Sequence, residues 1–439
     1  MNSLNFMEKL LASATLSTGD GVASSTGSLR RVEWKSLGEV ALYVRGLTYS
    51  KSNESGDNTG YKVLRANNIT LSRHTVNFDD VKFVKSDTKV KESQKLYQND
   101  ILISAASGSR EHVGKVAFIF SDLDYYFGGF MGVVRCSDQL HPRFLFHILT
   151  SGIFQKYLDE MLNSSTINNL SSSVMNAFII PIPCPDNPKK SLEIQTEIVR
   201  ILDTFTELTA ELTAELTARK KQYTYYRDQL LSFPEPVEGE EGEVEWKSLG
   251  EVAKKISSGG TPSTGVSEYY DGDIPWLRTQ EVNFGDIWDT GVKITESGLK
   301  NSSAKMIPAN CVIVAMYGAT VGKIGINKIP MTTNQACANI QLDESIANYR
   351  YVFHYLSSQY EYIKSLGSGS QTNINAQIVK NIKLPVPSLE EQARIVAILD
   401  KFDTLTTSIT EGLPREIELR QKQYEYYRDL LLTFPKTEA

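Results

Sequence analysis

The sequence contains the same framework twice. The ten residues VEWKSLGEVA at 32–41 return unchanged at 244–253. Two longer segments also repeat, at ten of fifteen and at eleven of fourteen positions: SLEIQTEIVRILDTF (191–205) with SLEEQARIVAILDKF (388–402), and KQYTYYRDQLLSFP (221–234) with KQYEYYRDLLLTFP (422–435). The stretches between these repeats barely resemble each other. A doubled framework with two different inserts predicts two domains that each recognise something different, at a distance that the framework fixes.

The repeats also give the expected domain boundaries, and a chain of 439 residues is expected to form two or three domains. We predict an N-terminal arm (1–31), a first insert domain (32–187), a central helix (188–234), an acidic linker (235–243), a second insert domain (244–387) and a distal helical region (388–439).

Both inserts show strand-like runs, polar loops and one helical stretch, which predicts an α/β fold. The runs are KVAFIF (115–120), GVVRC (132–136) and FIIPIP (178–183) in the first insert, and CVIVAMY (311–317), KIGIN (323–327) and LPVP (384–387) in the second, with helices near 142–160 and 346–364. At an offset of 204, residues 168–183 align with 372–387, with Asn169 on Asn373 and matching apolar positions. We therefore expect one fold with different surfaces.

The central segment predicts one long helix with a coiled-coil seam. After a turn at 184–190, Ser191 is the expected N-cap, and apolar residues follow at spacings of 4, 3, 4, 3 and 4: Ile194, Ile198, Ile201, Phe205, Leu208 and Leu212. The distal helix is expected to start at Ser388, in a capping box with Glu391, and to break at Gly412 and Pro414. Two seamed helices bury their stripes most simply against each other. The overall expectation is two pseudo-symmetric α/β domains joined by two long antiparallel coiled-coil helices, a geometry suited to a DNA duplex.

A four-residue repeat lies inside the central helix: TAEL occurs at 209–212 and again at 213–216. One copy adds just over one helical turn, about 6 Å and about 40° of rotation, and leaves the apolar stripe intact. The repeat is either a length-adjusting spacer or a duplication that an exposed helix tolerates, and the two interpretations are compatible.

The net charge of −6 does not exclude a nucleic-acid partner, because it is unevenly distributed. Residues 42–180 contain 15 Lys and Arg against 13 Asp and Glu, and residues 254–385 contain 12 against 10. The rest of the chain holds 19 basic and 29 acidic residues. The framework is therefore acidic, whereas the inserts are mildly basic.

The sequence shows no catalytic motif. There is no P-loop, HExxH, GxSxG or cluster of paired carboxylates, and Asn187-Pro188-Lys189 does not match the catalytic loop of adenine methyltransferases. We interpret FGGFMG (127–132) as a strand bend rather than a cofactor loop. No catalytic residue and no cofactor site are expected in this chain.

Cysteine usage and hydropathy place the chain in the cytoplasm. Four well-separated cysteines form no CxxC, and with five histidines they predict no metal site but reduced core residues: Cys136, Cys184, Cys311 and Cys337. No apolar run approaches membrane-spanning length, and Glu8 and Lys9 lie where a signal peptide needs its apolar region, so no membrane partner is expected.

The repeated segments resemble the specificity subunits of type I restriction–modification systems. So do SGGTPS (258–263) followed by IPW (274–276), TTNQACANI (332–340) and the two Pro-x-Pro exits. The TAEL copies and SITEGLPREIELRQKQYEYYRD (408–429) are similar to the type IC branch. The resemblance covers nearly the whole chain after residue 31; it is specific in the framework and generic in the first insert.

The resemblance implies a non-catalytic subunit with two target-recognition domains, each reading one half of an asymmetric, interrupted site in double-stranded DNA. It also implies that the helices act as a ruler and dock two modification subunits, which use S-adenosylmethionine to methylate adenine N6. Two restriction subunits would add ATP- and Mg-dependent translocation and cleavage.

Base reading requires Arg, Lys, Asn or Gln on loops that can enter the major groove. The candidate DNA-binding residues are Arg65, Asn67, Asn68, Arg73, His74, Arg110, His112 and Lys115 in the first domain, and Thr261, Arg278, Gln280, Tyr317, Lys323 and Gln371 in the second. Each is alternatively a solvated loop residue or a phosphate contact. Lys115 and Lys323 both follow a glycine and precede a strand, which favours a shared phosphate-positioning role. Trp276 is expected in the core.

Two other functions remain open at this point. The first is a stand-alone structural or regulatory DNA-binding protein that has lost its enzyme partners; co-purification with a methyltransferase would distinguish it. The second is a self-sufficient methyltransferase, which the missing catalytic loop disfavours.

Overall fold

The computed structural model describes residues 32–70, 74–107, 110–163, 169–234, 244–367, 373–408 and 410–434. The chain divides into two compact units. Unit 1 extends to Glu211 and takes up the chain again from Glu418, whereas unit 2 spans Leu212–Ile417. The division falls inside the TAEL repeat. The chain therefore passes between the units twice, once in each direction.

The repeated VEWKSLGEVA segments close the two domains in the same way. The first forms β1 (Val32–Ser36) and the short helix α2 (Leu37–Val40), and β1 pairs antiparallel with β12 (Ile179–Pro183). The second forms β13 (Glu245–Ser248) and α7 (Leu249–Val252), with β13 paired to β22 (Lys383–Val386). A Ser-x-x-Glu capping box starts each helix.

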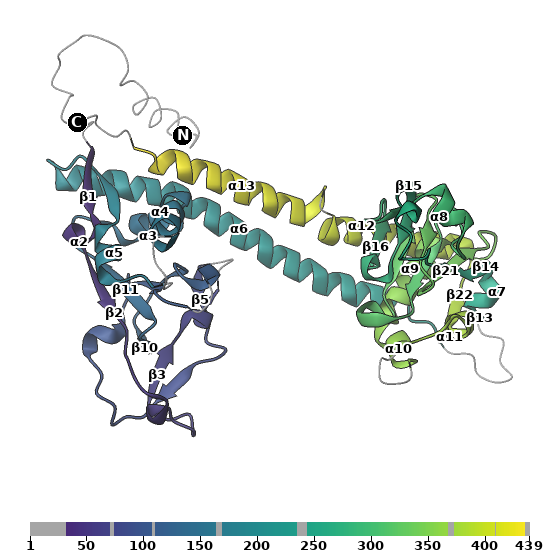
Figure 1. Cartoon of the computed structure of the whole chain (residues 1–439), viewed down its shortest axis with the longest axis horizontal. Helices are drawn as coiled ribbons and strands as arrows, with labels where there is room; N and C mark the ends of the chain where they lie inside the picture. Colours follow the sequence, from purple (N-terminus) through teal and green to yellow (C-terminus); the bar gives the residue numbers. More distant parts are fainter. Residues whose placement is uncertain are drawn as a thin grey trace, which may run out of the picture. The chain divides into compact units, whose positions relative to one another are not determined.

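The first domain contains two four-stranded sheets. One has the order β2-β11-β8-β9 and the other β6-β3-β10-β7. The bounds are β2 (Ala41–Arg45), β3 (Tyr61–Leu64), β6 (Lys82–Val84), β7 (Lys95–Leu96), β8 (Ile101–Ser104), β9 (Val116–Phe118), β10 (Leu123–Phe127) and β11 (Met131–Cys136), with a small pair of β4 (Ile69–Thr70) and β5 (Thr75–Val76). In Figure 1, β3 and β10 lie at the end of this domain away from α6 (Pro188–Leu230).

In the first domain, the sheet β2-β11-β8-β9 is covered on both faces, which explains its continuous apolar strands. Side chains alternate along β8: Ile101 and Ile103 join the core under the helices, while Leu102 joins a second core. The helices on the first face are α3 (Pro142–Leu149), α4 (Gly152–Asn163), α5 (Ser172–Ala177) and the first part of α6.

The second domain repeats this plan. Its sheets have the orders β14-β21-β18-β19-β16 and β17-β15-β20. The strand bounds are β14 (Ala253–Ser258), β15 (Tyr270–Leu277), β16 (Gly285–Ile287), β17 (Lys293–Ile294), β18 (Val312–Ala315), β19 (Ile324–Asn327), β20 (Thr332–Thr333) and β21 (Cys337–Leu342). The helices are α8 (Glu296–Lys300), α9 (Tyr349–Ser358), α10 (Tyr360–Ser365) and α11 (Ala376–Asn381). Residues Val312 and Val314 face the helix core and Ile313 the second core, as in β8.

Three predicted helices differ in detail from those of the structure. The stretches near 142–160 and 346–364 each form two helices, because the chain bends at Ser151 and at Gln359. The central helix begins at Pro188 rather than after Ser191. Asn187 caps it, with its Oδ1 accepting from the Lys190 amide at 3.1 Å, and proline suits the first turn. Ser191 is buried inside the helix.

The distal helices begin and break where the sequence predicts. Ser388 caps α12 (Leu389–Thr407), its hydroxyl accepting from the Glu391 amide at 3.2 Å. Helix α13 (Gly412–Leu432) starts at Gly412, whose φ of 74° is strained for any residue with a Cβ.

Each unit pairs one part of α6 with a distal helix. In unit 1, Phe205 of α6 stacks on Tyr427 of α13 with ring centroids 5.4 Å apart. In unit 2, Tyr226 of α6 stacks on Phe402 of α12 at 5.7 Å. The two pairs are equivalent in the repeated sequences. The predicted α/β domains with antiparallel paired helices are therefore confirmed.

Candidate nucleic-acid interface

Strand pairing brings three loops of the first domain to one edge. Strands β3 and β10 are parallel neighbours, so the residues that follow them lie side by side. These residues are the 3₁₀ turn Ala66–Asn68 after β3 and residues 128–130 after β10; the Gly128 amide donates to Leu64 O at 2.9 Å. Strands β11 and β8 are antiparallel, with Met131 opposite Ser104. The amides of Ala105 and Ala106 accordingly donate to Phe130 O at 2.8 and 3.0 Å.

We call this set loop edge 1. It comprises these three loops, at 65–68, 105–107 and 128–130, together with residues 45–48 and 110–115, which are joined to them through Leu47 N to Phe127 O at 2.7 Å and Gly114 N to Ser104 O at 2.8 Å.

The second domain builds the same edge from equivalent strands. Strands β15 and β20 are parallel and end together, and Cys337 at the start of β21 lies opposite Ala315 at the end of β18. The Asn334 amide donates to Leu277 O at 2.9 Å, and the Met316 amide to Ala336 O at 2.8 Å. We call residues 259–261, 278–281, 316–323 and 334–336 loop edge 2.

The structure brings Arg65 and Asn67 together on loop edge 1. Arg65 Nη2 and Asn67 Nδ2 both donate to Asp80 Oδ2, at 2.7 and 2.8 Å. Asn67 is exposed, so its amide oxygen is available to a partner. Asn68 is fully buried: its Oδ1 accepts from the Arg65 amide, and its Nδ2 donates to the carbonyls of Asn77 and Asp80. We therefore omit Asn68 from the proposed contact residues.

The remaining candidates of the first domain are more dispersed. Arg110 and His112 lie on the exposed turn that leads to Lys115, and Arg110 pairs with Asp159 of α4 at 3.0 Å. His74 turns inward, with Nδ1 3.3 Å from Val116 O, and burial lowers the pKa of its ring. A DNA contact from His74 would require it to leave this pocket. Arg73 lies outside the described residues.

On loop edge 2, Arg278 occupies the place of Arg65 and is paired with Glu281, Nε to Oε2, at 3.2 Å. Gln280 and Tyr317 are exposed, and the Lys323 ammonium donates to Asn283 Oδ1 at 2.7 Å. Gln371 lies outside the described residues.

Lys115 and Lys323 occupy equivalent positions. Each follows a glycine with positive φ, +79° at Gly114 and +81° at Gly322, and each glycine amide donates at 2.8 Å to the last part of the preceding strand, at Ser104 and Ala315. The shared backbone geometry is consistent with one positioning role in both domains.

Both copies of the framework match the model of a single protein family. The model of the type I restriction modification DNA specificity domain matches residues 31–219 and again 241–419. The chain belongs to this family. The EcoR124I/EcoR124II specificity subunit of Escherichia coli is 52% identical over 268 residues, which are 59% of this chain and 64% of that one. The EcoprrI specificity subunit of Escherichia coli is 31% identical over 94% of this chain and 93% of its own. The predicted family, with its type IC branch, is confirmed.

Solved structures support the fold. A chain from work on the assembly and conformational transition of a type I restriction–modification system covers 91% of this chain and 97% of its own, with a TM-score of 0.62 at 17% identity. The specificity subunit of M. genitalium covers 95% and 99%, with a TM-score of 0.52 at 15% identity. The two family matches coincide with the two copies of the framework.

A buried polar cluster fastens the first specificity domain to its helices. His147 of α3 has its Nε2 2.8 Å from Asp203 Oδ1 of α6 and its Nδ1 3.0 Å from the Tyr424 hydroxyl of α13. Arg143 pairs with the same carboxylate. Because a carboxylate only accepts, Nε2 carries the proton and Nδ1 accepts from tyrosine. We call these four residues helix joint 1.

The second specificity domain has the same cluster. His354 of α9 has its Nε2 2.6 Å from Asp400 Oδ1 of α12 and its Nδ1 3.5 Å from the Tyr223 hydroxyl of α6, while Arg350 Nη2 lies 2.6 Å from Asp400 Oδ1. We call these residues helix joint 2. In helix joint 1 the aspartate lies on α6 and the tyrosine on α13. In helix joint 2 the aspartate lies on α12 and the tyrosine on α6.

In helix joint 1 the carboxylate is charged and the imidazole is neutral. Burial lowers the pKa of His147 although Asp203 opposes this, so the imidazole is neutral near pH 7. Burial alone would raise the pKa of Asp203, but hydrogen bonds from His147 and Arg143 bring it below its usual value. The pKa of Asp400 is lowered in the same way, by hydrogen bonds from His354 and Arg350 that outweigh the effect of burial. The joints are structural clusters rather than an acid–base pair.

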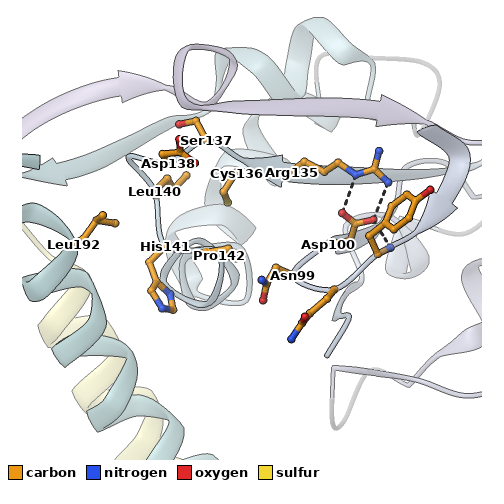
Figure 2. Close-up of a pocket in the computed structure, with 12 residues that line it drawn as sticks. Asn99, Asp100, Arg135, Cys136, Ser137, Asp138, Leu140, His141, Pro142 and Leu192 are labelled. Carbon is orange, nitrogen blue, oxygen red and sulfur yellow. Dashed lines mark hydrogen bonds and ion pairs between the residues drawn. The ribbon is translucent and has the colours of Figure 1, made fainter. Parts of the chain in front are cut away.

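A cavity of about 580 Å³ in unit 1 has no activated nucleophile among its lining residues. Figure 2 shows Arg135 and Asp100 facing each other, joined by bonds of 2.8 and 2.9 Å. Burial, and then the Asp100 charge, raises the pKa of the Cys136 thiol to about 12, so it stays protonated.

Three further observations concern the described residues. None of the described helices is long and apolar enough to cross a membrane. No cluster of three or more His, Cys, Asp or Glu side chains within these ranges is placed to hold a metal ion. Trp276 is buried, as predicted, with Nε1 donating to Gly260 O at 2.9 Å.

Phe130 and Gln335 are exposed residues of the loop edges that were not among the sequence candidates. Phe130 is 73% exposed at the tip of the turn that we predicted only as a strand bend. Gln335 is exposed at the equivalent turn and accepts a hydrogen bond from the Thr261 hydroxyl. Gln335 lies in TTNQACANI, a segment that carried the family resemblance, but nothing local marked it as a contact residue.

Proposed function

We propose that this chain is the DNA sequence-recognition subunit of a type I restriction–modification complex. Loop edge 1 and loop edge 2 each read one half of an asymmetric, bipartite site in double-stranded DNA, while α6, α12 and α13 set the gap. The observation that carries the proposal is the pair of loop edges: their backbones are equivalent, and their exposed side chains differ. Such a pair suits two readers of unlike sequences.

Within this function the contact residues divide by chemistry. Arg65, Asn67, Arg278 and Gln280 are suited to base edges, because Arg matches guanine and Asn or Gln matches adenine in the major groove. Lys115 and Lys323 are suited to phosphates. Arg110, His112, Thr261 and Tyr317 complete the proposed contacts of the described residues, and Arg73, His74 and Gln371 remain candidates.

The chain itself is proposed to be non-catalytic and to act through partners. Two modification subunits would bring S-adenosylmethionine and methylate adenine N6, and two restriction subunits would bring ATP and Mg for translocation and cleavage. The repeated helices offer candidate docking residues at equivalent positions: Tyr225 is 61% exposed and Tyr426 64% exposed. Exposed tyrosines are enriched at protein interfaces.

Single-molecule methylation mapping tests the proposal. DNA from cells that express this chain with its neighbouring modification gene would be compared with DNA from cells that lack this chain. We expect one new N6-methyladenine motif of two short half-sites with a fixed gap. If the partner is bound and no motif appears, a structural or regulatory DNA-binding role replaces the proposal. Binding of S-adenosylmethionine to the isolated chain would instead favour a self-sufficient methyltransferase.

Single substitutions then assign each half-site to a domain. Arg65→Ala should relax one half-site and Arg278→Ala the other, since each removes one bidentate donor. Arg200→Ala is the matched control: it removes the same charge from an exposed position on α6 that is not part of either loop edge. A control that changes the motif as the loop variants do would contradict the assignment.

A further inference from the structure

The turns that follow β10 and β20 are structurally equivalent. Gly128 and Asn334 each donate their amide to the strand beside them at 2.9 Å, and each turn closes onto the next strand, through Met131 N to Gly128 O at 2.7 Å and Cys337 N to Asn334 O at 3.2 Å. Gly128-Gly129-Phe130 therefore occupies the place of Asn334-Gln335-Ala336.

Both turns are held by a glycine from the strand next to them. A Cβ on Gly46 would lie 2.1 Å from Gly128 O, and a Cβ on Gly259 would lie 1.9 Å from Thr333 O. No side chain fits at such distances, so the backbones must meet here. Two residues after each of these glycines, a threonine lies beside the middle residue of the turn. Rigid backbone support is what a reading element requires, because its side chains must meet base edges in one geometry.

The first turn presents only an apolar group. Its glycines add no side chain, and Arg45 Nη2 fixes the backbone by donating to Gly129 O at 3.0 Å. Phe130 projects from this support and is 73% exposed, although an aromatic ring is ordinarily buried. Arg65 and Asn67 lie beside it at the end of β3. Phe130 is thus the apolar residue of a group whose other members, Arg65 and Asn67, are polar.

The second turn presents an amide instead. The residue equivalent to Phe130 is Ala336, which is buried, and the exposed side chain is Gln335. The Thr261 hydroxyl donates to Gln335 Oε1, which leaves the amide NH₂ as a donor toward solvent. The equivalent threonine of the first turn is Thr48. A Cβ added to Gly129 would lie 3.0 Å from the Thr48 Oγ1, but Gly129 has no side chain for Thr48 to position.

We propose that these turns are specificity determinants that read by opposite chemistry. Phe130 contacts the C5-methyl group of a thymine in one half-site. Gln335, positioned by Thr261, donates to an acceptor on the major-groove edge of a base in the other half-site. Apolar contact is the way proteins recognise the thymine methyl, and amide donors recognise purine N7 and carbonyl acceptors. This inference rests on the proposed function and assigns the recognition chemistry within it.

The first test maps methylation with variants. Phe130→Ala should relax a single A·T position of one half-site, and Gln335→Ala a single position of the other. Phe130→Leu retains apolar contact and should keep the preference, which separates lost contact from lost folding. Phe120→Ala is the matched control: Phe120 is 63% exposed in the same domain but follows the other end of β9. It should leave the motif unchanged.

The second test uses DNA in which single thymines are replaced by uracil, which removes only the methyl group. With the complete methyltransferase complex, one substitution in the half-site of the first domain should weaken binding about fourfold, the effect of one buried methyl-sized group. In Phe130→Ala the same substitution should have no effect.

The outcomes separate the inference from the function. If wild type gives a bipartite motif but Phe130→Ala leaves every position strict and uracil is tolerated everywhere, the inference is overturned and the function stands. A uniform fall in methylation without a relaxed position would also overturn it, because Phe130 would then support binding without reading a base. If wild type gives no motif, the proposed function itself fails.

Discussion

The helix joints and the loop edges lie in the same two domains, yet they differ in what the duplication preserved. Helix joints 1 and 2 use the same four residue types on equivalent helices, as Arg143, His147, Asp203 and Tyr424 and as Arg350, His354, Asp400 and Tyr223. The loop edges share backbone hydrogen bonds, but their side chains differ. Gly-Gly-Phe in the turn of the first domain corresponds to Asn-Gln-Ala in the turn of the second.

Burial accounts for the difference. The histidines of both joints are fully buried, so loss of any partner would leave a polar group without a hydrogen bond or a charge without its counterion. Phe130 and Gln335 are exposed, and substitution there costs little folding free energy. Attachment of the domains is therefore constrained by stability, whereas the exposed residues of the loop edges are free to differ, as the proposed reading of two unlike half-sites requires.

The largest expected effect comes from a change that alters neither joint nor loop edge. Deletion of residues 213–216 removes one TAEL copy, shortening the helix by about 6 Å and rotating its end by about 40°. We expect methylation of the original site to be lost and a site with the same half-sites and a shorter gap to appear. Methylation mapping measures this; an unchanged gap, or changed half-sites, would refute a ruler role.

Disruption of a joint should cost stability and leave the motif unchanged. Asp203→Ala leaves Arg143 without its carboxylate, and we expect the free energy of unfolding to fall by about 2–4 kcal/mol, somewhat below the value for a fully buried pair. Hydrogen exchange should localise the loss to unit 1, whereas Asp400→Ala should affect unit 2. If either variant relaxes a base position of the methylated site, the separation of joint from loop edge is contradicted.

Acid should weaken unit 1 through three histidines, of which His147 is buried and His74 and His141 are half-buried. Burial lowers the pKa values of His74, His141 and His147 below the usual 6.5, so the unfolded chain binds protons that the folded unit does not. Stability is complete above about pH 6.5 and falls as pH drops toward the lowered folded pKa values. His147→Gln should flatten this slope by up to about 1.4 kcal/mol per pH unit in denaturant titrations. A slope equal to that of wild type would contradict a neutral, buried His147.

The smallest expected effect distinguishes the two joints themselves. The Tyr424 hydroxyl lies 3.0 Å from its histidine and the Tyr223 hydroxyl 3.5 Å from its own. Tyr424→Phe should therefore cost about 1 kcal/mol of stability, and Tyr223→Phe less, because a contact at 3.5 Å is a weak hydrogen bond. Equal losses in chemical unfolding would show that the joints are energetically alike despite their geometry.

Much of the framework could be predicted because its signals are local or repeated. The seam of α6, the Ser388 cap, the break at Gly412 and the shared fold of the inserts all follow from periodicity, capping residues or direct alignment. The start of α6 was misplaced by four residues because Ser191 also has the chemistry of a cap. Only tertiary packing, which buries Ser191, favours Asn187.

The site was only partly predictable because its geometry depends on distant pairings. Arg65 and Arg278, which the structure places on the loop edges, could be selected as candidates because arginine in a loop is a direct signal. The joint between His147 and Tyr424 spans 277 residues, and the parallel pairing that puts Phe130 beside Arg65 joins strands about sixty residues apart. Nothing local announces such neighbours. Asn68 was chosen for its residue type, yet its amide is used entirely within the protein.

Each domain is completed by a tyrosine from the other half of the duplicated sequence. Tyr424 of the distal repeat joins unit 1, and Tyr223 of the central repeat joins unit 2. The chain is thus organised as a dimer with exchanged segments whose two copies have become one gene product. A chain that ended before the linker would carry its own Tyr223 but lack Tyr424, and two such chains could supply the tyrosine to each other. In the proposed function, two copies within one chain are free to differ from each other, so the DNA target need not be a palindrome.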